Sequence, residues 1–199
     1  MGGRGSGGAG GGGRGGSGKS NYEAKPTRIT EDDWYDWQVD PEPFQDALNK
    51  GELPKYIEGR RLTTAESEHM YDVAHQMQND GMKTLNKDVT TVYRGESYSS
   101  RTAAEAKYKQ GSTITTNKLT SVTTNRSVAQ EYANMGGGGK VKVLQIVTNA
   151  GGTRGLKIPQ SNEIVSPKGL QYKVTSTSWD GKSNTLKVYL FRMEGKRGR

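Results

Sequence analysis

The hydrophobic pattern divides the chain into a helical first half and a strand-rich second half. Within Ala65–Asp80, apolar side chains recur at the spacing of one helix face, at Met70, Val73, Ala74 and Met77. A threonine pair at 63–64 can cap this helix, and residues 79–81, Asn-Asp-Gly, are a typical end. After Asp88 the pattern changes to short apolar runs separated by Gly, Asn and Pro, which is typical of antiparallel strands. This order of elements predicts an α+β fold.

In the second half we expect several short strands with two helices between them. Strands are expected over Val89–Tyr93, which Arg94-Gly95 closes, and over Ser112–Ile114, Lys118–Thr123, Val141–Ile146 and Thr185–Met193. Helices are expected around Ala103–Tyr108 and over Ser127–Asn134, the second of them stopped by the glycine run 136–139.

The segment before this domain is acidic and aromatic. We take residues 21–61 as a helical lead-in and residues 62–199 as the domain itself. Trp34 and Trp37 are three residues apart and therefore share one helical face, and a second short helix is expected near Gln45–Asn49. We expect these helices to pack on the flank of the domain.

Residues 1–20 form a low-complexity tail. Glycine occupies 12 of these 20 positions, and such a backbone is too entropic to order on its own. Its Gly-Arg pieces are similar to segments that bind nucleic acid loosely, although a plain flexible tether is the interpretation that composition favours. We therefore predict a disordered tail.

Charge and composition exclude several classes of function. The formal net charge is +8, which favours polyanionic partners, and the chain has no cysteine for disulfides or zinc–thiolate sites. The two histidines, His69 and His75, are six apart and cannot stack as metal ligands on one helix face, so no metal is expected. No apolar run is long enough to span a membrane. We expect a protein made in a cytoplasm, with its oligomeric state left open.

Three stretches carry candidate chemistry. The first is Thr90–Gly95, an expected strand that ends in an arginine and a glycine. The second is Leu119–Ala133, a Ser/Thr-rich strand followed by a helix. In the third, Ile158–Val174, a loop leads to Glu163, a short strand, a Pro-Lys-Gly turn and a second strand. Taken singly, Arg94 reads as a strand-end ion pair and Glu163 as a solvated edge-strand glutamate.

In order and spacing, these stretches resemble the R-S-E class of mono-ADP-ribosyltransferases, over roughly residues 62–193. The resemblance implies two small antiparallel sheets packed as a split β-sandwich, with NAD in the cleft between them and a helical layer in front. It implies an NAD-dependent transferase that modifies a host protein or nucleic acid and releases nicotinamide. The tail is similar to those of some bacteriophage head-associated proteins, so we also expect a phage or bacterial origin and action in a host cytoplasm or on a virion.

The resemblance also implies a role for each candidate residue. Arg94 holds the NAD diphosphate, because a guanidinium offers phosphate a planar fork of donors, and Gly95 lets the backbone approach closely. Ser121 and Thr123 alternate on one side of their strand and support the nicotinamide pocket. Glu163 is the catalytic carboxylate, which stabilises the cationic ribose of the transition state.

One position departs from the family pattern. Arginine-modifying relatives carry a second acid two residues before the glutamate, and other relatives carry glutamine there. This chain has Ser161, and Gln160 substitutes only if the loop shifts by one residue. An arginine acceptor is therefore disfavoured, which leaves hydroxyl or amide side chains, nucleic-acid bases or water as acceptors, or an inactive domain. The rival hypothesis is a non-catalytic phage head or nucleic-acid-associated structural protein.

Overall fold

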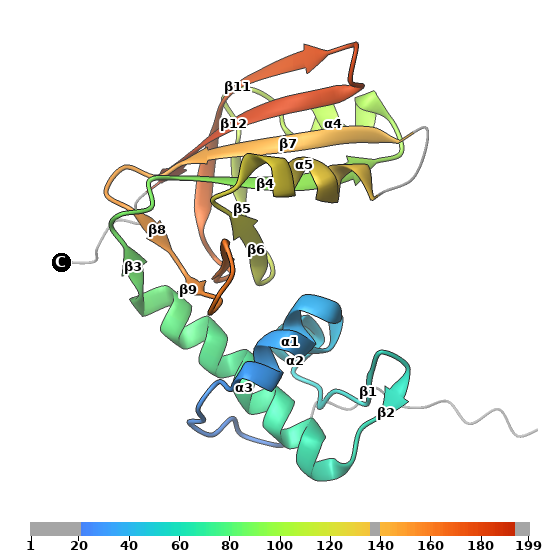
Figure 1. Cartoon of the computed structure of the whole chain (residues 1–199), viewed down its shortest axis with the longest axis vertical. Helices are drawn as coiled ribbons and strands as arrows, with labels where there is room; N and C mark the ends of the chain where they lie inside the picture. Colours follow the sequence, from blue (N-terminus) through green and yellow to red (C-terminus); the bar gives the residue numbers. More distant parts are fainter. Residues whose placement is uncertain (1–20, 136–139, 194–199) are drawn as a thin grey trace, which may run out of the picture.

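The computed structural model describes residues 21–135 and 140–193. The predicted disordered tail, the glycine run 136–139 and the basic residues after Met193 lie outside the described ranges. Figure 1 shows helices α1 to α3 as a layer on one side of a curved sheet, with α4 and α5 lying against the sheet itself. The α+β class predicted from the sequence is confirmed.

The helical layer contains α1 (Glu31–Val39), α2 (Glu42–Lys50) and α3 (Thr64–Lys83). Capping boxes at Thr30 and Thr63 start α1 and α3, because each threonine accepts a backbone N–H and the acid three residues later returns the bond. The short strands β1 (Tyr56–Ile57) and β2 (Arg60–Arg61) form a small antiparallel pair between α2 and α3.

The predicted end of α3 at residues 79–81 is wrong, because the helix continues through Gly81 to Lys83. A side chain at Gly81 would already touch the ring of Pro167, so this glycine allows close packing of α3 against the turn before β11. Tertiary packing has here overridden the weak helix propensity of glycine.

The main sheet has eight strands in the order β5-β11-β12-β7-β4-β6-β10-β9. Their bounds are β4 (Thr91–Tyr98), β5 (Thr113–Thr115), β6 (Thr120–Thr123), β7 (Val141–Thr148), β9 (Leu156–Lys157), β10 (Glu163–Ser166), β11 (Gln171–Asp180) and β12 (Thr185–Met193). A separate pair joins β3 (Leu85–Asn86) to β8 (Thr153–Arg154).

The expected two antiparallel sheets differ from the observed sheet in two details. Hydrogen bonds join all eight strands, and β12 runs parallel to β7. Within the described residues, strand pairing nevertheless joins the two halves at a single residue pair, Tyr93 on β4 with Thr123 on β6. We call this junction the seam. An apolar core fills the space between the halves and includes Val92 of β4, Val143 of β7 and Ile164 of β10.

The prediction that Arg94-Gly95 closes the first core strand is wrong. Strand β4 runs on to Tyr98, because its antiparallel ladder with β7 continues from Thr91 to Tyr98. Arg94 and Gly95 therefore lie in the middle of a strand. Helix α5 (Arg126–Asn134) packs over this part of β4 and over β7, and α4 (Arg101–Lys107) contacts the same strands (Figure 1).

A second apolar core joins the helical layer to the sheet. It contains both tryptophans of α1, residues of α2 and α3, and Leu119, Ile158 and Val165 from the strand half. Residues 21–61 are therefore packed directly against the loops and strand that carry Glu163.

Candidate functional site

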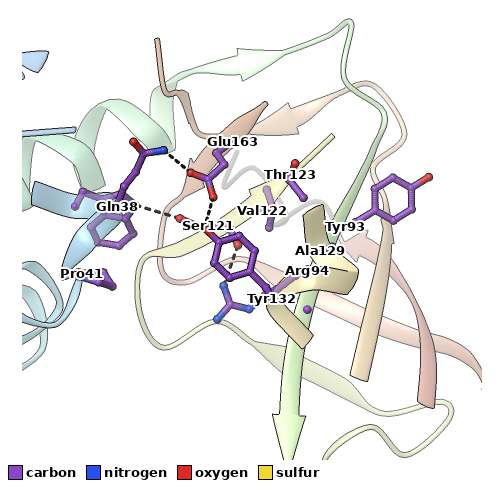
Figure 2. A pocket seen from close by; sticks show the side chains of 12 residues that line it. Gln38, Pro41, Tyr93, Arg94, Ser121, Val122, Thr123, Ala129, Tyr132 and Glu163 are labelled. Carbon is purple, nitrogen blue, oxygen red and sulfur yellow. Dashed lines mark hydrogen bonds between the residues drawn. The ribbon is translucent and has the colours of Figure 1, made fainter. Parts of the chain in front are cut away.

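The candidate site is a pocket of about 200 Å³ at the seam of the sheet. Figure 2 shows side chains from α1, β4, β6, α5 and β10 converging on it. The pocket is lined by predicted residues from three separate stretches of sequence: Arg94, Gly95, Ser121, Thr123 and Glu163. The remaining lining residues are Trp37, Gln38, Pro41, Tyr93, Val122, Ala129 and Tyr132.

Glu163 is the first residue of β10 and is 8% exposed. It pairs with Thr123 of β6, so the ladder fixes its backbone at the pocket. The Gln38 side-chain amide donates to Oε2 of the Glu163 carboxylate at 2.7 Å, and the Tyr132 hydroxyl donates to Oε1 at 3.4 Å (Figure 2). Burial and the Glu163 charge raise the pKa of Tyr132, which therefore stays a neutral donor at pH 7.

Ser121 stands between the helical layer and β4. Its hydroxyl accepts a hydrogen bond of 3.1 Å from the indole Nε1 of Trp37, and its backbone carbonyl accepts one of 2.9 Å from Nη1 of Arg94. Trp37 is 2% exposed and belongs to the helical core, so the position of α1 and the position of β6 are coupled through this serine.

Arg94 is held in place by a partly buried acid that the sequence interpretation did not identify. Its Nε lies 3.1 Å from Oε1 of Glu96. The hydroxyls of Tyr98 and Tyr108 donate to the other oxygen, at 3.0 and 2.6 Å. Burial alone would raise the pKa of Glu96, but the charges of Arg94 and Lys107 and the Tyr108 bond outweigh it and lower this pKa to about 2. The guanidinium is thus aimed by a carboxylate that is ionised at neutral pH.

Gly95 and Thr123 position helix α5. A Cβ at Gly95 would lie 1.8 Å from the Ala129 carbonyl oxygen, so the close approach expected at this glycine is that of α5. The Thr123 hydroxyl accepts the backbone N–H of Asn125, the residue that caps α5. Both residues therefore act on the pocket by placing the helix that carries Tyr132.

The loop residues Ser161 and Gln160 lie outside the lining of this pocket. The Ser161 hydroxyl accepts the backbone N–H of Glu163 at 3.1 Å, which turns the chain into β10. Gln160 has a left-handed backbone, with φ of 58°, and lines a separate hollow beside Trp34 and Tyr35. Gln160 therefore does not lie beside Glu163 in the pocket.

Sequence reasoning missed Trp37, Gln38 and Glu96. The tryptophan spacing indicated a buried helix face, and Trp34 and Trp37 are indeed buried. The tryptophan spacing does not indicate that α1 reaches the site. The partners of Trp37 and Gln38 are Ser121 and Glu163, which lie 84 and 125 residues further along the chain. Tyr132 lies in the helix expected after the Ser/Thr-rich strand, but its contact with Glu163 is visible only in the structure.

The arrangement presents one carboxylate, one guanidinium and neutral hydrogen-bond donors around a partly apolar pocket. A buried carboxylate held by donors stabilises positive charge that develops beside it, and a fixed guanidinium binds an anion such as phosphate. Among the described residues, no group of three or more His, Cys, Asp or Glu side chains could hold a metal ion. No helix in the described ranges is long and apolar enough to cross a membrane.

The fold is that of the ADP-ribosyltransferases. Vis toxin, an ADP-ribosyltransferase from Vibrio splendidus, matches with a TM-score of 0.57 and 16% identity, over 85% of this chain and 76% of that one. Plx2a, an ADP-ribosyltransferase toxin from Paenibacillus larvae, matches with a TM-score of 0.55 and 15% identity, over 83% and 88%. An ADP-ribosyltransferase from Clostridium botulinum matches with a TM-score of 0.52 and 11% identity, over the same shares of the two chains. No protein-family model and no curated protein matches the sequence.

Proposed function

We propose that the protein is an NAD-dependent mono-ADP-ribosyltransferase that modifies a host macromolecule and releases nicotinamide. One observation carries the proposal. Arg94, Ser121 and Glu163 are far apart in the sequence, yet they line one pocket in a chain with this fold. Structures with the same fold include exoenzyme S bound to carba-NAD and Vis bound to agmatine.

The chemistry assigns a task to each side chain. The bond between C1′ of the ribose and the nicotinamide nitrogen breaks, and its electron pair leaves with nicotinamide. The Glu163 carboxylate stabilises the resulting cationic ribose, and Arg94 holds the diphosphate. Ser121 positions Arg94 through its backbone carbonyl, which accepts the guanidinium N–H. The acceptor then attacks C1′ and gives up a proton.

The acceptor follows from the groups beside Glu163. The Glu163 carboxylate has two side-chain hydrogen-bond partners, the amide of Gln38 and the hydroxyl of Tyr132. Neither group can take a proton from a guanidinium. Ser161 supplies no carboxylate either. We therefore propose a hydroxyl or amide side chain, a nucleic-acid base or water as the acceptor, in preference to arginine.

The proposal is tested with Glu163→Gln and labelled NAD. The variant keeps the size of the side chain and loses the charge that stabilises the ribosyl cation. Nicotinamide release and label transfer to a host lysate should each fall by about a hundredfold or more. Glu105→Gln, at an exposed acid of α4, is the matched control and should keep full activity.

A separate measurement distinguishes the enzyme from a structural protein with the same fold. NAD or nicotinamide should raise the unfolding temperature of the wild type, because a ligand that binds only the native state stabilises it. No stabilisation, or full activity in Glu163→Gln, would overturn the proposed function.

A further inference from the structure

The outer face of the sheet beside α5 carries a row of apolar side chains. On β12, alternate residues point to this face, where Tyr189 is 37%, Phe191 42% and Met193 40% exposed. The ladder places Ile146 of β7 next to Tyr189, and Tyr93 of β4 next to Ile146, so the row crosses three strands. We call these five residues the apolar row.

Cations flank this row on the same face. Lys173 of β11 is directly paired with Phe191. Beside α5 a hollow of about 350 Å³ is lined by the cations Arg126, Lys142 and Lys187. Asp180 offsets one of them, since its carboxylate lies 3.6 Å from Lys187. Aromatic rings therefore lie between positive charges along a continuous strip of the face.

We infer that this strip binds single-stranded nucleic acid. A strand binder needs aromatic faces on which bases stack and cations that follow the phosphates, and the outer face supplies both. An apolar protein partner would not call for the flanking cations.

The spacing of the rings suits successive nucleotides. Neighbouring outward residues of a strand are two positions apart, which is roughly 7 Å at about 3.4 Å per residue. Tyr189 and Phe191 have this spacing, and an extended single strand separates its bases by a similar distance. From Lys187 to Met193 the strip is roughly 20 Å long, enough for about three nucleotides.

Apart from Tyr93 at its β4 end, which also lines the pocket, the strip lies outside the pocket that holds Glu163. Helix α5 separates them, because its Ala129 and Tyr132 line the pocket whereas its Gln130 and Asn134 line the basic hollow. In Figure 1, α5 lies over β4 and β7 and leaves β12 uncovered. Binding at the strip therefore does not depend on the proposed transferase activity.

The test is fluorescence anisotropy of the full chain with labelled 15-nucleotide oligo-dT and oligo-rU. Tyr189→Ala and Phe191→Ala should each weaken binding about tenfold, as expected for the loss of one stacking platform. Lys173→Gln should weaken it less and lower the slope of log K against log salt by about 0.7. Comparing the two oligonucleotides tells DNA binding from RNA binding.

Three controls keep the test interpretable. Tyr56→Ala removes a more exposed aromatic residue, in strand β1 beside the helical layer, and should change nothing. Arg4→Ala with Arg14→Ala removes the arginines of the tail and should leave the effects of the strip variants in place. Unfolding temperatures should match that of the wild type. The inference is overturned by absence of binding, by binding that ignores the strip variants, or by a dimer that Phe191→Ala dissociates.

Discussion

Gln38 is the residue that most directly connects the helical layer to the proposed chemistry. Its amide meets Glu163 at 2.7 Å although the two residues are 125 positions apart. Because Gln38 is exposed, this charge-assisted bond adds little to the stability of the fold, but it fixes which way the carboxylate faces. We interpret Gln38 as a positioning residue for Glu163.

Gln38→Met should separate positioning from stability. Methionine keeps the length of the side chain and loses the donor, so kcat for NAD cleavage should fall about tenfold while KM changes less. The unfolding temperature should stay constant, because Gln38 is exposed. Gln130→Met on the outer side of α5 is the control. An unchanged kcat would remove Gln38 from this role.

Glu96 gives the protein a pH-dependent stability. Its pKa is about 2 in the folded protein against an ordinary 4.5, so it stabilises the fold fully above about pH 4.5. This contribution is lost as the pH falls from there towards 2. Glu96→Gln should therefore cost on the order of 3 kcal/mol at pH 7, at about 1.4 kcal/mol per pKa unit.

The measurement for Glu96→Gln is urea unfolding of the variant and the wild type at several pH values. The difference in unfolding free energy should be constant between pH 7 and 5 and should narrow below pH 4.5. A difference that stays the same down to pH 3 would show that the ionised carboxylate is not its source.

At this scale, sequence motifs mark residues that the structure brings to one pocket, and they miss residues whose partners are distant along the chain. Arg94, Ser121 and Glu163 each sit at a recognisable place in an ordered pattern. Glu96 has no such pattern, because its partners are Arg94, Tyr98 of β4 and Tyr108 just after α4, which come together only when the sheet forms. The role of Gln38 could not be predicted for the same reason, because its partner Glu163 is 125 residues away in the chain.

At the scale of elements, the close packing of α5 on β4 depends on the absence of a side chain at Gly95. In Gly95→Ala the new methyl group would overlap the backbone of α5, so the helix must move away from β4. We expect a destabilisation of about 2 kcal/mol or more and weaker NAD binding, because α5 carries Tyr132.

Gly181→Ala is the matched control for Gly95→Ala, since its Cβ would meet only Nε1 of Trp179 at an ordinary 3.5 Å. Calorimetry measures the unfolding temperature of each variant, and titration with NAD measures its dissociation constant. If Gly95→Ala unfolds at the wild-type temperature, the packing of α5 is not set by this glycine.

Element boundaries show what local pattern reasoning leaves out. The strand Thr185–Met193 was predicted to the residue, because its apolar alternation is strict. Strand β4 was cut short at Arg94-Gly95 and α3 at Gly81, because glycine normally ends such elements. At Gly95 the backbone of α5 packs against β4, and at Gly81 the ring of Pro167 packs against α3. Neither contact can be predicted from the residues adjacent in sequence.

For the whole molecule, the class of fold was predictable but the pairing of its strands was not. Order and period indicate which segments are strands. They do not reveal that β12 runs parallel to β7, because these strands are separated along the chain by β8 to β11. Nor do they reveal that α1 packs on the loop before Glu163.

The seam between β4 and β6 makes the sheet mechanically weak at its centre. One residue pair and the bond from Arg94 to the Ser121 carbonyl connect the two halves there, and the pocket opens at this point. A ligand that binds Arg94 on one half of the sheet and Glu163 on the other would connect the two halves and stabilise the seam.

Hydrogen–deuterium exchange with and without NAD measures this stabilisation. Protection should rise in β4, β6 and β10 together, whereas the long β11–β12 ladder should exchange as before. Protection confined to one side of the seam would mean that the ligand does not span it. If NAD bridges the seam as proposed, we expect the ligand-free protein to be the more flexible of the two states.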